Sequence, residues 1–124
     1  MNTTQIINEL KAKYPGKRIV KNNKTDPTEI ICEIEPTSDH PKWSNAVAVI
    51  DQSLPHFHIN STEEYTVLKG TLIITKEGKD YNIPQGQSFI VYRGEHHSAK
   101  GNSTWVECKS TPGWTPEDHT LIAL

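Results

Sequence analysis

The stretch that decides the fold runs from Pro55 to Gly70 and reads PHFHINSTEEYTVLKG. His56 and His58 are two residues apart, so they point to the same side of a β-strand but to different faces of a helix. Glu63 and Glu64 follow after a gap long enough for a turn, at the head of a second strand-like run. Two imidazoles and one carboxylate from neighbouring strands make up most of a metal site, which would need one further ligand.

Length and composition indicate a single globular domain. The chain has 124 residues and a mass of 14.0 kDa, and a domain of this size folds without disulfides. Cys32 and Cys108 form no C-x-x-C pair, so we expect two free thiols and a cytoplasmic location. The first five residues, MNTTQ, do not resemble a signal peptide, and the longest apolar run, Ala46 to Ile50, is too short to span a membrane.

The charge pattern gives no reason to expect a nucleic-acid partner. The net charge is −2 and the isoelectric point is about 6.3. Residues 1–24 contain six Lys or Arg and one Glu, a net charge of +5, so residues 25–124 carry −7. We interpret the basic segment as a solvated helix and loop in preference to an arm that binds anions.

The hydrophobic pattern predicts one short helix followed by strands. Residues 4–13 have helical periodicity, with Thr3 or Thr4 as the expected N-cap, and Pro15-Gly16 ends the helix. Short β-type runs separated by Gly, Pro and Asn turns then favour an antiparallel sandwich or barrel. The expected strands are 18–21, 29–35, 46–50, 64–69, 71–75, 79–83, 88–92, 97–99, 104–109 and an edge strand at 120–123.

A second cluster, Gly86 to His97, supplies the missing ligand and a family resemblance. The chain resembles the cupin superfamily, whose first motif is G, five residues, H-x-H, three or four residues, E, six residues, G. His56, His58, Glu63 and Gly70 match that spacing, and Gly86, Gly94 and His97 match the second motif, which runs G, five residues, P-x-G, two residues, H, three residues, N. The departures are Ile50 for the opening Gly, Tyr92 for the Pro, and an Asn displaced by one position to Asn102.

The resemblance implies an all-β fold, a double-stranded β-helix or jelly-roll barrel with a short N-terminal helix. It implies one domain over residues 1–124, with the helix and turn in 1–16, the metal-binding motifs in 50–102 and a C-terminal tail in 110–124. It also implies a divalent metal held by His56, His58, Glu63 and His97. Such a ligand set suits Fe, Mn, Ni, Zn, Co or Cu, and the sequence does not choose among these metals.

Alternation along the strands indicates which neighbours face the site. Glu64 and His96 are expected to point away from Glu63 and His97. Tyr65 shares the face of Glu63, and Tyr65 and Tyr92 are candidate catalytic residues that would offer phenol groups to a substrate. Seven further residues have weaker assignments from the sequence. Trp105 and Glu107 are candidates for the cavity wall, and Cys108 is expected to point away from it. The tail with Trp114, Glu117, Asp118 and His119 either closes one end of the barrel or forms a surface turn, and we favour the surface turn.

These features predict a metal-dependent enzyme that acts on a small organic molecule, of dioxygenase, isomerase or lyase type, with the metal as Lewis acid or oxygen-binding centre. The alternative is a non-catalytic domain that binds or senses a small molecule or sugar. We expect no nucleic-acid or membrane partner. A homodimer is also expected, because strands 30–34 and 46–50 could present apolar faces to a second copy.

Overall fold

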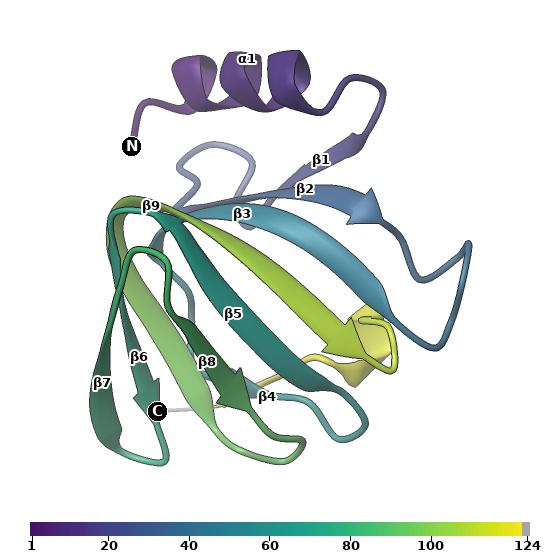
Figure 1. The fold of residues 1–124 in the computed structure, drawn as a ribbon, viewed down its shortest axis with the longest axis vertical. Helices are drawn as coiled ribbons and strands as arrows, with labels where there is room; N and C mark the ends of the chain where they lie inside the picture. Colours follow the sequence, from purple (N-terminus) through teal and green to yellow (C-terminus); the bar gives the residue numbers. More distant parts are fainter. Residues whose placement is uncertain (123–124) are drawn as a thin grey trace.

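The computed structural model describes residues 1–122, and its strands form one antiparallel sheet that curls into a jelly-roll barrel (Figure 1). A single α-helix, α1 (Thr3–Lys13), precedes the sheet, and a short 3₁₀ helix, η1 (Pro116–Asp118), lies in the C-terminal tail. The expected all-β fold with a short N-terminal helix is confirmed. The strands are β1 (Arg18–Lys21), β2 (Glu29–Glu35), β3 (Ser44–Gln52), β4 (His56–Phe57), β5 (Thr62–Lys69), β6 (Thr71–Lys76), β7 (Lys79–Pro84), β8 (Ser88–Val91), β9 (His97–Thr111) and β10 (Thr120–Leu121).

Strand β9 is the centre of the sheet. It pairs antiparallel with four strands, β3 and β4 on one edge and β5 and β6 on the other, so this long strand joins both parts of the barrel wall. The interior between these parts is filled by apolar side chains that alternate along the strands. The buried members of this inner core are Ala48, Ile50, Tyr65, Val67, Leu72, Ile74, Ile83, Val91, Ala99 and Val106.

A second core lies between α1 and the outer face of β2, β3 and β9. Ile6 and Leu10 of the helix pack against Ile30, Val49 and other buried residues of these strands. The strands that were expected to offer apolar faces to a second copy are therefore covered by the helix of their own chain. The homodimer remains a prediction, and this particular support for it was wrong.

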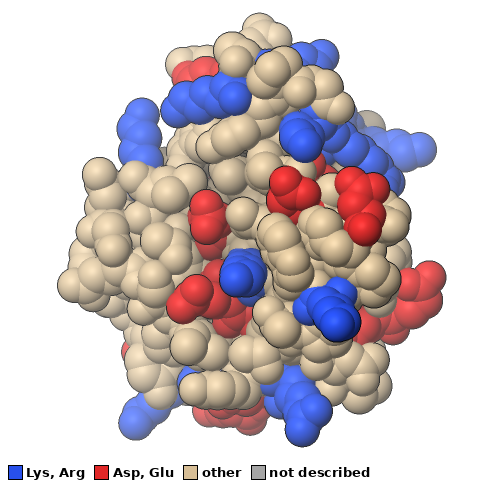
Figure 2. Space-filling view, turned by 45° about the vertical axis from the view of Figure 1, so that its right-hand side comes forward, with Lys and Arg blue, Asp and Glu red and all other residues tan. Residues whose placement is uncertain are grey.

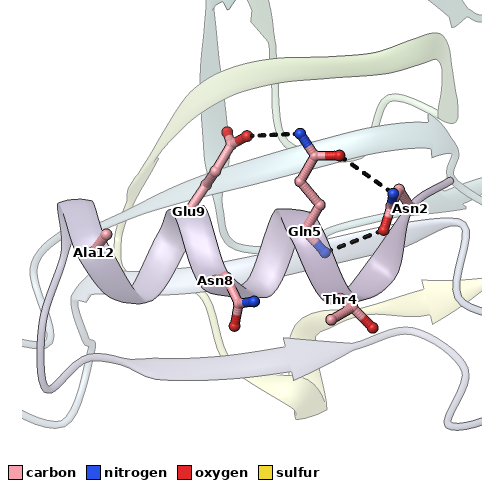
Figure 3. Close-up of a pocket in the computed structure, with 6 residues that line it drawn as sticks. All are labelled: Asn2, Thr4, Gln5, Asn8, Glu9 and Ala12. Carbon is pink, nitrogen blue, oxygen red and sulfur yellow. Dashed lines mark hydrogen bonds between the residues drawn. The ribbon is translucent and has the colours of Figure 1, made fainter.

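The opposite face of α1 is polar and carries its own hydrogen bonds (Figure 3). Asn2 is the N-cap, because its side-chain oxygen accepts from the backbone N–H of Gln5 at 3.1 Å. The Gln5 side chain in turn donates to Glu9 at 3.3 Å. The expectation of Thr3 or Thr4 as N-cap was wrong by one or two residues.

The turn expected at Gly101-Asn102 is instead an irregularity inside β9. Opposite β3, the pairing steps from Ile50–Thr104 to Gln52–Lys100, so β9 carries extra residues here, and Ser103 has a φ of 47°. Gly101 approaches β3 so closely that an added Cβ would lie 2.8 Å from the carbonyl oxygen of Ile50. The irregularity reverses the alternation, because His97 and Ala99 face the interior before it and Val106 and Cys108 face the interior after it.

That reversal overturns two expectations for β9. Trp105 belongs to the core under α1, and neither it nor Glu107 lines the cavity. Cys108, expected to point away, is part of the cavity wall. Both cysteines are free thiols, as expected.

Basic and acidic side chains are both spread over the face that Figure 2 shows. Several lysine and arginine side chains lie around the upper end, which carries α1, while side chains of both signs lie in the middle and at the lower end. No helix within residues 1–122 has the length and apolar character that a membrane crossing requires.

Candidate metal centre

The four residues that match the ligand motifs meet inside the barrel. His56 lies on β4, His58 just after it, Glu63 at the start of β5, and His97 at the start of β9 directly opposite His56. All four side chains are buried, and their ligand atoms lie within 4.8 Å of one another. The cluster could therefore hold a metal ion. The two histidines of the His-x-His spacing lie together with Glu63 and His97, as the motifs predicted.

Each histidine has its outer ring nitrogen bound to a backbone carbonyl. His56 Nδ1 donates to Leu54 O at 2.7 Å, His58 Nδ1 to Asp118 O at 2.6 Å, and His97 Nδ1 to Glu95 O at 3.1 Å. A carbonyl can only accept, so each Nδ1 carries a proton and the Nε2 atoms are the ones directed at the cluster. This arrangement orients imidazoles as metal ligands.

Glu63 is the common neighbour of the cluster. Its Oε1 lies 2.9 Å from His58 Nε2 and 3.1 Å from His97 Nε2. Tyr65 donates its hydroxyl to the same oxygen at 3.2 Å, and the Cys108 thiol donates to Oε2 at 3.3 Å. Burial alone would raise the pKa of Glu63, but the contacts with His58 and His97 outweigh it and hold that pKa well below its usual value.

The residues present fit a divalent transition metal. His58 is 3% exposed, and its Nε2 makes no hydrogen bond of acceptable geometry with any residue in 1–122, despite the short distance to Glu63. A buried nitrogen of this kind normally has a partner, and a cation at the centre of the cluster would provide one. Burial and the neighbouring His97 lower the pKa of His56 to about 3, which keeps its imidazole neutral and able to coordinate.

A cavity of about 660 Å³ opens from the cluster, and its wall is acidic. Glu29, Glu33, Glu35 and Glu117 line it in addition to Glu63, whereas Arg18 is the single Lys or Arg among the described lining residues. Arg18 itself lies 3.6 Å from Glu33. Burial, followed by the charge of Glu63, raises the pKa of Glu29 to about 7, so this carboxyl group is partly protonated near neutral pH.

The C-terminal tail closes one side of this cavity, which corrects the expectation of a surface turn. Asp118 is buried against the loop that follows His58, and His119 stacks on the ring of His56 with centroids 4.3 Å apart. Trp114, Glu117 and His119 all line the cavity. The predicted edge strand is present as β10, which pairs with β4, while residue 123 of that prediction lies outside the described residues.

The two tyrosines proposed from the sequence lie in different environments. Tyr65 is buried and lines the cavity, where its hydroxyl is bound to Glu63. Tyr92 is 58% exposed and does not contribute to the cavity wall, so it has no position from which to meet a substrate there. It follows the end of β8, in the turn that leads to Gly94. Glu64 and His96 are exposed, as the alternation predicts, and His96 stacks on Phe57 outside the site.

Sequence reasoning missed Glu29 as part of the site, and for His119 it favoured a surface turn over a place at the end of the barrel. Glu29 stands on the inner face of β2, and alternation with Ile31 and Glu33 was a usable signal once the inward face of that strand was known. His119 had no such signal, because no periodicity connects an irregular tail to a barrel.

A curled antiparallel barrel with a buried cluster of three histidines and one glutamate defines a small β-barrel protein with a centre able to hold a metal. A family model described as "Cupin domain" matches residues 47–109, just over half of the chain. The chain belongs to the cupin domain family, as its motifs indicated.

Solved structures support the same fold. A variant of Pac13 from Streptomyces, solved with uridine, superposes with a TM-score of 0.76 at 12% identity over 90% of this chain and 88% of Pac13. Pac13 is described as a nucleoside dehydratase. The polyketide cyclase RemF from Streptomyces resistomycificus matches with a TM-score of 0.68 at 17% identity, over 90% of this chain and 83% of RemF.

KdgF from Halomonas sp. matches with a TM-score of 0.63 at 18% identity, over 73% of this chain and 85% of KdgF. Identities this low establish the fold and leave the activity open. A search of curated protein sequences found no match.

Proposed function

We propose that this protein is a metal-dependent enzyme that acts on a small organic molecule, of dioxygenase, isomerase or lyase type. The observation that carries the proposal is the convergence of three histidine Nε2 atoms and the Glu63 carboxylate beside a 660 Å³ cavity. Pac13 and RemF, which share the fold, are described as a dehydratase and a cyclase, and this supports enzyme chemistry in a barrel of this shape.

The protein's own residues would hold the metal and orient the substrate. His56, His58, His97 and Glu63 are the ligands, and Tyr65 fixes the carboxylate through its hydroxyl. A bound divalent metal would act as a Lewis acid or as an oxygen-binding centre, and Fe, Mn, Ni, Zn, Co and Cu all suit this donor set. Glu29, with its raised pKa, is the carboxyl group in the cavity best placed to give or take a proton near neutral pH.

The wall of the cavity favours a neutral or positively charged substrate. Glu33, Glu35 and Glu117 are acceptors, and Asn45 Oδ1 is a buried oxygen without a hydrogen-bond partner within the described part of the chain. Substrate hydroxyl or amine groups would satisfy these oxygens, whereas a dianion would be repelled by the carboxylates.

Elemental analysis tests the metal site. Wild type is purified beside His56→Ala/His58→Ala, stripped with a chelator and titrated with Fe, Mn, Ni or Zn. We expect about one metal per chain in wild type and none in the double variant. His96→Ala is the matched control, because it removes an exposed imidazole next to a ligand and should leave the metal content unchanged. A wild-type protein that neither holds nor gains a metal would contradict the proposal.

Turnover separates an enzyme from a binding domain. Metal-loaded protein is screened against small neutral and cationic diols, enols, catechols and diketones, with oxygen uptake recorded where the metal is redox-active. Under the proposal Glu63→Ala abolishes turnover, whereas a protein that only binds would show affinity for a compound and no product. We also expect a homodimer in a reducing, cytoplasmic environment, and a monomeric mass by light scattering would contradict the dimer.

A further inference from the structure

The C-terminal tail is bound to the metal-binding loop through one carboxylate. Three consecutive backbone N–H groups after His58 donate to Asp118: Ile59 to Oδ1 at 2.6 Å, Asn60 to Oδ2 at 3.0 Å, and Ser61 to Oδ2 at 3.0 Å. The Ser61 hydroxyl also donates to Pro112 O at 2.9 Å. Charge-assisted hydrogen bonds to backbone N–H groups are strong, so Asp118 fixes the loop between His58 and Glu63.

The same residue sets the orientation of His58. The backbone carbonyl of Asp118 accepts from His58 Nδ1 at 2.6 Å, while the corresponding carbonyls for His56 and His97 lie two residues away in their own strands and loops. The His58 ring is thus held by a residue 60 positions further along the chain. If the tail shifts, the Nε2 of His58 leaves its position in the cluster.

His119, the next residue, lies beside the ligands without being one. Its ring stacks on that of His56 at 17° and lies 5.3 Å from that of His58, and it lines the cavity. Trp114 donates its indole N–H to His119 Nδ1 at 3.4 Å. An accepting Nδ1 leaves the proton of the neutral ring on Nε2, so His119 has an N–H available to a ligand in the cavity.

We propose that the tail, residues 113–119, contributes two residues to the metal centre. Asp118 is a positioning residue for His58, and His119 donates a hydrogen bond to a ligand bound on the metal. This inference rests on the proposed metal site and deepens it. The family model ends at residue 109, so the match to the family says nothing of these residues.

Cobalt affinity tests the role of Asp118. Chelator-stripped wild type, Asp118→Asn and Asp118→Ala are titrated with Co²⁺, and the visible absorption of the bound ion reports both affinity and ligand geometry. Loss of an outer-shell partner typically weakens metal binding 10- to 100-fold, and we expect that loss in Asp118→Ala and a smaller one in Asp118→Asn. Glu64→Gln is the control, because it removes an exposed carboxylate next to Glu63 that lies outside the cavity and the tail.

Azide, a small anion that binds to cobalt, tests the role of His119. Azide affinity is measured on cobalt-loaded wild type, His119→Phe and His119→Gln. Phe keeps the stacking on His56 but lacks the N–H, so we expect azide to bind about tenfold more weakly while the cobalt affinity stays within about threefold. Gln retains a donor and should recover part of the azide affinity.

The outcomes separate the two levels of the proposal. Failure of wild type to bind cobalt would overturn the metal site and this inference together. Wild-type cobalt binding with equal affinity in the Asp118 variants and Glu64→Gln would overturn only the positioning role. Unchanged azide affinity in His119→Phe, or no azide binding in wild type, would overturn the donor role. Circular dichroism of each metal-free variant identifies misfolding, and Asp118→Asn, which keeps the shape of the side chain, then decides the positioning role.

Discussion

Replacing Glu29 by Gln should stabilise the metal-free protein at pH 8 and leave its stability at pH 4 nearly unchanged. The Glu29 carboxyl group lies in the cavity, where burial and the charge of Glu63 raise its pKa from 4.5 to about 7. A raised pKa in the folded state means that the folded protein prefers the neutral acid. The stability from this preference is fully present below pH 4.5 and is lost as the pH rises through 7.

The magnitude follows from the two pKa values. The interval between 4.5 and about 7 corresponds to about 3 kcal/mol at about 1.4 kcal/mol per pH unit. Glu29 is only half-buried and borders an open cavity, so we expect about 1 to 3 kcal/mol of the free energy of unfolding. Gln has the shape of the protonated acid and no proton to lose, so the variant avoids this destabilisation at high pH.

Urea unfolding of both proteins in the presence of a chelator, at pH 4, 6 and 8, measures the effect. The difference in unfolding free energy between Glu29→Gln and wild type should grow from near zero at pH 4 to its full value at pH 8. Glu64→Gln is the matched control, because it removes an exposed carboxylate of the same sheet. A difference that is the same at pH 4 and pH 8 would refute the reasoning, since it would mean that Glu29 ionises equally easily in the folded and unfolded chains.

Two further predictions concern the sheet around the site. Tyr65→Phe removes the hydroxyl that donates to Glu63, so it should lower the free energy of unfolding by about 1 kcal/mol and weaken Co²⁺ binding. Tyr92→Phe, at an exposed position, should change neither quantity in the same urea and cobalt titrations. Gly101→Ala places a Cβ against Ile50 O and the Thr104 side chain and should destabilise the fold by about 2 kcal/mol or more. Gly78→Ala is the comparison. Its Cβ meets open space, so any loss of stability there comes from the backbone conformation alone. A melting temperature of Gly101→Ala at or above that of wild type would show that β9 can widen at this point.

The tail shows where sequence reasoning stopped. Asp118 and His119 reach the centre only because the chain returns to β4 after the last long strand, and the hydrogen bonds that hold Asp118 span 57 to 60 residues. Contacts of that separation leave no periodic signal in the sequence. The residues therefore resembled those of an ordinary polar turn.

Strand β9 shows a second limit of the same kind. Alternation can be extended from a known inward residue such as His97 only while the strand is regular. The extra residues between Lys100 and Thr104 reverse it, so Cys108 faces the cavity and Trp105 the helix.

The sequence by itself determined the class of fold and the four residues of the buried cluster. His56, His58, Glu63 and His97 could be named because a strand places every second side chain on one face, a local property that spacing alone reveals. Only the tertiary structure decided what surrounds them: the acidic wall with Glu29, the donors to Glu63, and the tail that holds His58. The physical reason is that these neighbours come from distant segments, and their burial and charge exist only once the barrel has closed.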